Sequence, residues 1–288
     1  MKIIQVGFLV ITFFLSLESI GSSDCMKSMR NILVRRHDRI QTIRSITGKI
    51  KKVMADLARH DKNTSEHSFA VAQISARMGK RMGFSGLEQS ELVFSALIHD
   101  IGKLEVPLEI LTSNAKLTNK EFTIMKNHVG IFLDKKITEV IGYTDNLTEK
   151  KIWKRLKTIA SQHHEKYNSK GYIQGLNSNE IEQISQIIAL ADVWDAMRAK
   201  RSYKRPFSLK KTFAIISTGA SSGDFNPNLY QTFKKIIIKY EYENLEKLKL
   251  KLQKMRSDPK FVANDEYEYI KNMLGADLEY LASLNSPF

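Results

Sequence analysis

The sequence predicts an all-α protein, in which a helical bundle is preceded by a helical extension and followed by further helices. Apolar residues recur at three- to four-residue spacing along most of the 288-residue chain, whereas the alternation typical of strands is scarce. Only 14 glycines and 5 prolines interrupt the chain, and 42% of its residues are hydrophobic, which is enough for a sizeable core. We therefore expect one large helical domain with an extension at each end.

The first element is an apolar run over residues 3–17, preceded by a lysine and followed by small residues. Residues 1–23 are expected to be a signal peptide or an N-terminal membrane anchor. Basic residues are more numerous after the run than before it, which favours an uncleaved inner-membrane anchor with the rest of the chain in the cytoplasm. The alternatives are export after cleavage, or a cytoplasmic protein that starts at Met26 or Met29.

Residues 24–59 are predicted to form a basic helical linker. Met26 to Lys62 holds eleven Lys and Arg against three Asp, within a chain of net charge +14. Such a face can attract nucleic acid, anionic lipid or a small anion, but the sequence contains no groove-reading or RNA-binding motif, so specific nucleic-acid binding is not expected. Apolar spacing over residues 32–57 predicts a helix that packs on the domain or forms a homodimer with a second copy.

Five of the seven histidines, together with two aspartates, form the chemically informative pattern. Most of them continue apolar helical stripes, namely His67-Val71-Ile74-Met78, Leu92-Ala96-His99-Lys103, Ile152-Leu156-Ile159-His163 and Ile184-Ile188-Asp192-Asp195. A lone histidine on such a face is usually a hydrogen-bonded core residue, but so many on matching faces are better explained by a shared partner. A metal ion satisfies several buried polar groups at once.

The adjacent pairs His163-His164 and His99-Asp100 favour two metal ions over one. Neighbouring side chains on a helix diverge by about 100°, so a single ion rarely takes both, whereas a carboxylate can bridge two ions. Because Cys25 is the only cysteine, the ligands are imidazole and carboxylate, which suit Fe and Mn, and also Ni, Cu or Zn.

These residues resemble the motifs of the HD-GYP family, a branch of the HD superfamily of metal-dependent phosphohydrolases. The resemblance runs from about His60 to Lys204. The matching stretches are HSFAVAQISARMGKRMG from His67, ALIHDIGKLEVPLEIL from Ala96, KLTNKEFTIMKNH ending at His128, HHEKYNSKGY from His163 and IIALADVWDAMRAKRSYK ending at Lys204. The resemblance implies an HD-type helical bundle over residues 60–240 that is the catalytic domain, holds two divalent metals, commonly Fe or Mn, and hydrolyses cyclic di-GMP.

Motif position also implies a role for each residue. His67, His99 and Asp192 would hold one metal, His128, His163 and His164 the other, and Asp100 would bridge them. Lys103, Arg201 and Lys204 match positions that contact substrate phosphates, and Asp100 and Lys103 are the expected catalytic residues. A water between two divalent ions is acidified toward neutral pH, and the resulting hydroxide is the expected nucleophile.

Three features depart from the family pattern or stay open. Asn63 stands where three-metal members carry glutamate, which favours two metals and linear pGpG, rather than GMP, as the product. The loop reads Asn168-Ser169-Lys170-Gly171 instead of Asp-Gly-x-Gly, and Gly171-Tyr172-Ile173 instead of Gly-Tyr-Pro, so its shape and stiffness should change. A nucleotide receptor without turnover and an HD hydrolase of another nucleotide are therefore the alternatives. Asp195 is expected either to orient a ligand histidine or to close its helix.

Residues 241–288 are predicted to be a C-terminal helical extension. The Asp-Phe-Asn-Pro stretch ending at Pro227 predicts a turn and a helix start, and Pro259 predicts the end of that helix. A last helix is expected from about Asn264 to Leu284. A bundle cap is favoured over a partner-binding tail.

Overall fold

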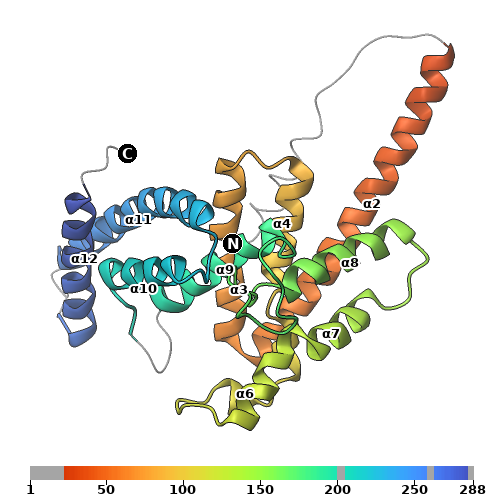
Figure 1. Ribbon diagram of the computed structural model, residues 1–288. Coiled ribbons are helices and arrows are strands. Elements are labelled where there is room, and N and C mark those ends of the chain that lie inside the picture. The colour runs from red at the N-terminus through yellow and green to blue at the C-terminus, as the bar shows by residue number, and fades with distance from the viewer. Residues whose placement is uncertain (1–22, 200–204, 258–262, 285–288) are drawn as a thin grey trace.

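The computed structural model describes residues 23–199, 205–257 and 263–284, and every regular element in these ranges is a helix (Figure 1). The prediction of an all-α fold is confirmed. The elements are α2 (Ser23–His60), α3 (Lys62–Arg81), α4 (Gly86–Ile98), η1 (Ile101–Glu105), α5 (Leu108–Leu111), α6 (Asn119–Lys126), η2 (Asn127–Val129), α7 (Ile131–Ile141), α8 (Leu147–Ser161), α9 (Gln183–Arg198), α10 (Leu209–Ser221), α11 (Pro227–Arg256) and α12 (Asp265–Ser283).

Helix α2 combines a projecting N-terminal half with a C-terminal half that packs on the bundle (Figure 1). Ile46, Ile50 and Leu57 are buried in a core that also contains Leu133 of α7 and Trp153 of α8. Of the two alternatives for this helix, packing on the domain is therefore observed for its second half. A homodimer through residues 32–57 stays a prediction, and the buried part of that stripe is already engaged within the chain.

The centre of the bundle is built by α3, α4 and α9, because each presents an apolar stripe to the others. Asp61 caps α3 by accepting a hydrogen bond from the backbone N–H of Thr64, and Ser85 caps α4 with a capping box. Val71 of α3 and Leu92 of α4 are fully buried in one core. The polar residues at the ends of these stripes are thereby directed to one place.

The C-terminal helices continue this core. Asn226 caps α11 and Pro227 is its first residue, while Asn264 caps α12, so both predicted helix starts are confirmed. The expected boundary between residues 240 and 241 lies inside the uninterrupted helix α11. Leu245 on α11 and Leu274 on α12 belong to the same buried cluster as the central helices, which is the arrangement of a bundle cap.

The expectation of an inner-membrane anchor is overturned. Within the ranges that the structure describes, none of the helices has the length and apolar character needed to cross a bilayer. Residues 1–22, on which that expectation depended, lie outside these ranges.

Candidate metal centre

Five histidines and two aspartates from separate elements converge in the middle of the bundle. His67 comes from α3, His99 is the C-cap residue of α4, and Asp100 precedes η1. His128 lies in η2, the pair His163-His164 follows Gln162, the C-cap of α8, and Asp192 lies on α9. The stripes read from the sequence therefore meet as predicted.

One group of potential ligands lies around His67. Its Nε2 is 2.8 Å from Asp192 Oδ1 and 3.9 Å from Asp100 Oδ2. His99 Nε2 is 3.3 Å from the same Asp100 oxygen. Ligand atoms of His67, His99 and Asp100 lie within 4.8 Å of one another, which is close enough to share an ion.

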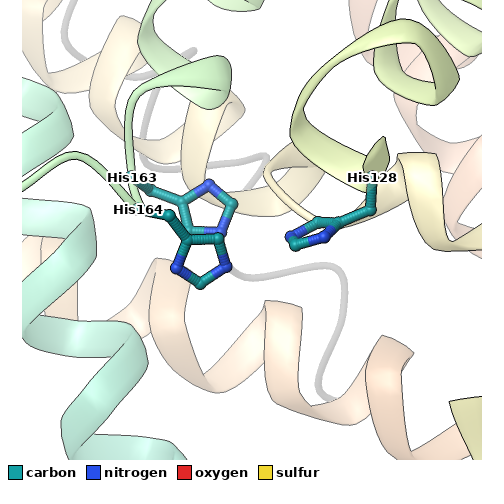
Figure 2. A group of neighbouring side chains, drawn as sticks. All are labelled: His128, His163 and His164. Carbon is teal, nitrogen blue, oxygen red and sulfur yellow. The ribbon is translucent and has the colours of Figure 1, made fainter. Parts of the chain in front are cut away.

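The second group consists of His128, His163 and His164, whose rings face one another across a small gap (Figure 2). The ring centroids of His128 and His164 are 5.0 Å apart, and those of His163 and His164 are 4.0 Å apart. Asp100 Oδ1 lies 3.3 Å from His128 Nε2. The two oxygens of Asp100 therefore face different groups, as a bridging carboxylate requires.

The strongest evidence that a metal fits is the set of buried atoms without a partner. His99, His128 and His163 each place Nδ1 against the backbone carbonyl three residues earlier, at 2.7, 2.6 and 2.8 Å. A carbonyl only accepts, so Nδ1 carries the proton and Nε2 presents a lone pair. These three Nε2 atoms and Asp100 Oδ1 are half of the buried side-chain polar atoms that lack a hydrogen-bond partner in the described part of the chain. Imidazole and carboxylate atoms left bare in this way suit a divalent metal.

Protonation of the second group of histidines agrees with that role. Burial lowers the pKa of His128 to about 3 and of His164 to about 4, and holds the pKa of His163 well below its ordinary value. These imidazoles are neutral at physiological pH, as metal ligands must be. His67 differs: burial would lower its pKa, but hydrogen bonds to Asp192 and Asp195 outweigh it and raise the pKa to about 9.

Asp195 orients His67. Its Oδ2 accepts a hydrogen bond from His67 Nδ1 at 2.7 Å, so Nε2 faces Asp192 and Asp100. Of the two roles considered for Asp195, this contact favours orientation of His67, and the role itself stays a prediction. Carboxylates that hold a ligand imidazole from behind fix its tautomer and raise its basicity.

Lys103 reaches into the centre, because its Nζ lies 2.7 Å from Asp100 Oδ2 and its side chain is 20% exposed. The glycine before it permits this geometry, since a Cβ on Gly102 would lie 2.0 Å from the carbonyl oxygen of His128. Asn63 is exposed one turn before His67. Arg201 and Lys204 lie outside the described residues.

The loop after His164 closes one side of the centre. Tyr172 stacks on His164 with ring centroids 4.8 Å apart. Gly171 passes close to the backbone of Glu165, where a Cβ would lie 2.4 Å from its Cα. Ser169, which stands at a position where the family has glycine, has a φ of 62°, in the left-handed region that favours glycine.

Glu165 is a structural residue that the sequence analysis missed. Its buried carboxylate accepts hydrogen bonds from the backbone N–H groups of Gln174, Gly175 and Leu176, at 2.7, 3.2 and 3.1 Å. These bonds hold the loop that places Tyr172. The only signal in the sequence was an acidic residue directly after the histidine pair, and no helical stripe marked it as buried.

The fold and the site together define a class, that of helical-bundle proteins whose clustered histidines and aspartates can bind metal. The HD domain family matches residues 51–229, more than half of the chain, and the chain therefore belongs to the HD domain family. This match confirms the HD part of the resemblance seen in the sequence.

Three curated relatives carry names that concern cyclic dinucleotides. A cyclic di-GMP phosphodiesterase of Thermotoga maritima is 34% identical, over 61% of this chain and 45% of the relative. A probable cyclic di-GMP phosphodiesterase of Vibrio cholerae is 38% identical over 48% and 31%. A 3'3'-cGAMP-specific phosphodiesterase of the same organism is 30% identical over 60% and 35%. The chain spans less than half the length of each of these relatives.

Proposed function

We propose that the protein is a metal-dependent phosphodiesterase that hydrolyses cyclic di-GMP to linear pGpG, using two divalent ions, Fe or Mn. The observation that carries the proposal is the convergence of bare, buried Nε2 atoms in two groups that share Asp100. The names of the relatives support the cyclic dinucleotide as the substrate class.

In this proposal the ligands divide as the motif positions suggest. His67, His99 and Asp192 would hold one ion, and the histidines of the second group would hold the other. Asp100 would be shared by both, since its two oxygens face different groups. Bound there, the two ions would supply an activated water and positive charge for the phosphate oxygens.

Two further side chains act on the substrate in this proposal. Lys103 carries a positive charge at the edge of the centre, where it can hold a phosphate oxygen whose charge grows during the reaction. Burial, with the charges of Asp192 and Asp100, raises the pKa of Tyr172 above its ordinary value. The phenol therefore keeps its proton and can donate a hydrogen bond. Arg201 and Lys204 are proposed as further phosphate contacts on motif position alone.

Asn63 supports the choice of two ions and of pGpG as the product. It is exposed at the position where the glutamate of three-metal members would stand, and an amide oxygen is a weaker ligand than a carboxylate. GMP is expected as the product only if a third ion binds.

The test uses the full chain, loaded with Mn or Fe, incubated with cyclic di-GMP and analysed by separation of the nucleotides. We expect pGpG to accumulate, and metal analysis to give two ions per chain. Tight binding without turnover would instead identify a receptor, which the altered loop at Ser169 and Ile173 would explain. Turnover of only another nucleotide, such as 3'3'-cGAMP, would identify a different HD hydrolase.

A further inference from the structure

An exposed aromatic side chain lies beside the candidate metal centre and has no role in the core. Phe122 on α6 is 46% exposed. Its ring meets that of Tyr172 edge to face at 6.3 Å, and Tyr172 in turn stacks on His164. A row of rings therefore leads from a candidate metal ligand to solvent.

Helix α6 serves the metal centre rather than the core. None of its residues is buried. It runs directly into η2, and the carbonyl of Met125 in its last turn accepts the hydrogen bond from His128 Nδ1. An apolar ring on such a helix contributes little burial free energy to folding. The short connection to η2 nevertheless fixes its distance from the histidines of the centre.

A cation accompanies the row of rings. Lys126 lies one turn after Phe122, on the same face of α6. Its Nζ is 5.1 Å from the ring centroid of Phe122 and 5.8 Å from that of Tyr172. An exposed ring beside a half-buried cation suits a nucleobase, because the face of the base can stack on the ring and its edge can accept a hydrogen bond from the cation.

We propose that Phe122 is the stacking platform for one base of the substrate and that Lys126 donates to the acceptor edge of that base. The proposal rests on the proposed function, because the metal centre must hold the phosphate for the base to reach α6. Guanine presents two acceptors, O6 and N7, on one edge, whereas adenine presents a donor beside N7. Lys126 therefore favours guanine on this platform.

The first experiment measures binding and turnover by the metal-loaded full chain. Base–aromatic stacking contributes about 1–3 kcal/mol, so Phe122→Ala should raise KM for cyclic di-GMP by roughly 5- to 150-fold while kcat and metal content change little. Phe122→Trp keeps a stacking surface and should restore KM. Tyr143→Ala is the matched control, since Tyr143 is 93% exposed on the loop between α7 and α8.

A direct readout of stacking uses a cyclic dinucleotide that carries 2-aminopurine. Its fluorescence should be quenched on binding to the wild type and to Phe122→Trp, and should recover in Phe122→Ala. If Phe122 only covered Tyr172, its removal would leave the quenching unchanged and would not raise KM while kcat stayed the same. Unchanged quenching and KM in Phe122→Ala would overturn the platform.

The lysine is tested by base selectivity. Lys126→Met keeps the aliphatic stem and should weaken cyclic di-GMP binding more than cyclic di-AMP binding; equal losses would overturn the assigned donor. These experiments distinguish failure of the proposed function from failure of the platform. If the wild type does not hydrolyse cyclic di-GMP but quenches the probe, and Phe122→Ala does not, the hydrolase is disproved and the platform is retained. If the wild type hydrolyses cyclic di-GMP and Phe122→Ala has the same KM and quenching, the platform is disproved and the hydrolase is retained.

Discussion

The metal centre and a cluster about Arg198 both bury charged side chains, but they differ in how those charges are satisfied. At the end of α9, Arg198 pairs with Asp277 of α12 at 2.8 Å and with Glu241 of α11 at 3.1 Å. It also donates to the carbonyl of Phe207, while the other oxygen of Asp277 accepts from the backbone N–H of Leu209. In the metal centre, by contrast, four buried atoms have no partner.

This difference separates a structural site from a functional one. A buried polar group destabilises the fold unless something compensates it. Around Arg198 the chain itself supplies every compensating group and so joins α9 to the C-terminal helices. Around Asp100 the missing partner has to come from outside the chain. A cluster of unpartnered imidazole and carboxylate atoms, rather than buried charge as such, therefore points to the ligand site.

The largest effect should come from removing the shared ligand of the metal centre. Asp100→Ala should abolish binding of at least one ion and lower kcat by roughly a thousandfold or more, because the metals contribute several kcal/mol to the transition state. Metal analysis and product separation measure both losses. A chelator should lower the Tm of the wild type more than that of the variant. Turnover by a metal-free variant would disprove the mechanism.

A large loss of stability, without loss of metal, should follow from breaking the Arg198 cluster. Arg198→Met leaves Glu241 and Asp277 buried without a countercharge, which costs about 3–5 kcal/mol. Urea unfolding measures this loss, and metal content per folded chain should stay at the wild-type value. If Arg198→Met does not fold, Arg198→Lys keeps the charge and should show a smaller loss. An Arg198→Met variant that keeps the full stability of the wild type but loses metal would contradict the structural role of this cluster.

A smaller effect on metal affinity is expected from Asp195. Asp195→Asn keeps the size of the side chain but removes the charge that holds His67 from behind, so metal affinity should fall by roughly 10- to 100-fold. Competition with a chelator measures the affinity. Because the same change barely alters packing, the Tm of the metal-free protein should stay near that of the wild type. An unchanged metal affinity would show that Asp195 only closes its helix.

Whether the sequence predicts a feature of these two sites depends on how far apart in the chain the interacting residues lie. Helical stripes predicted that His67, His99, His163 and Asp192 face one place in the bundle, and their side chains do meet there, because a side chain that continues an apolar face follows the 3.6-residue period. Local capping likewise fixed the ends of α12, at Asn264 and Leu284. Each of these predictions used residues within a few turns of one another.

The parts that were missed depend on contacts between distant segments. Arg198 and Asp277 are 79 positions apart, and nothing near either residue marks it as buried. Glu165 turns inward because a loop closes over its carboxylate, which no periodicity records. Packing of α2 on the domain was one of two alternatives, and the burial of Ile46 and Ile50 shows it, while the homodimer stays a prediction.

The stability that the Arg198 cluster contributes should depend on pH, because one of its two carboxyl groups has a shifted pKa. Burial raises the pKa of Glu241 above its ordinary value of 4.5, despite the charge of Arg198. A carboxyl group with a raised pKa in the folded state contributes stability below pH 4.5, and this contribution is lost as the pH rises through the folded pKa. The free energy of unfolding, measured in urea, should therefore fall between about pH 4 and 8 in the wild type, and should fall less in Glu241→Gln. If the free energies of the two proteins changed with pH in parallel, the pKa of Glu241 would not be raised by folding.

The smallest effect concerns backbone strain beside the metal centre. Ser169 is the only non-glycine residue with positive φ in the described part of the chain, and the Arg198 cluster has no such residue. A left-handed conformation costs a residue with a Cβ about 1–2 kcal/mol, part of which glycine loses again through its greater unfolded-state entropy. Ser169→Gly should therefore stabilise the protein by roughly 0.5–1 kcal/mol, measured as a rise in Tm, while Ser169→Ala should not. Because the conformation is relieved rather than changed, KM for cyclic di-GMP should stay the same. A rise in KM would mean that the stiffness of this loop, and not only its shape, helps to hold the substrate over the metals.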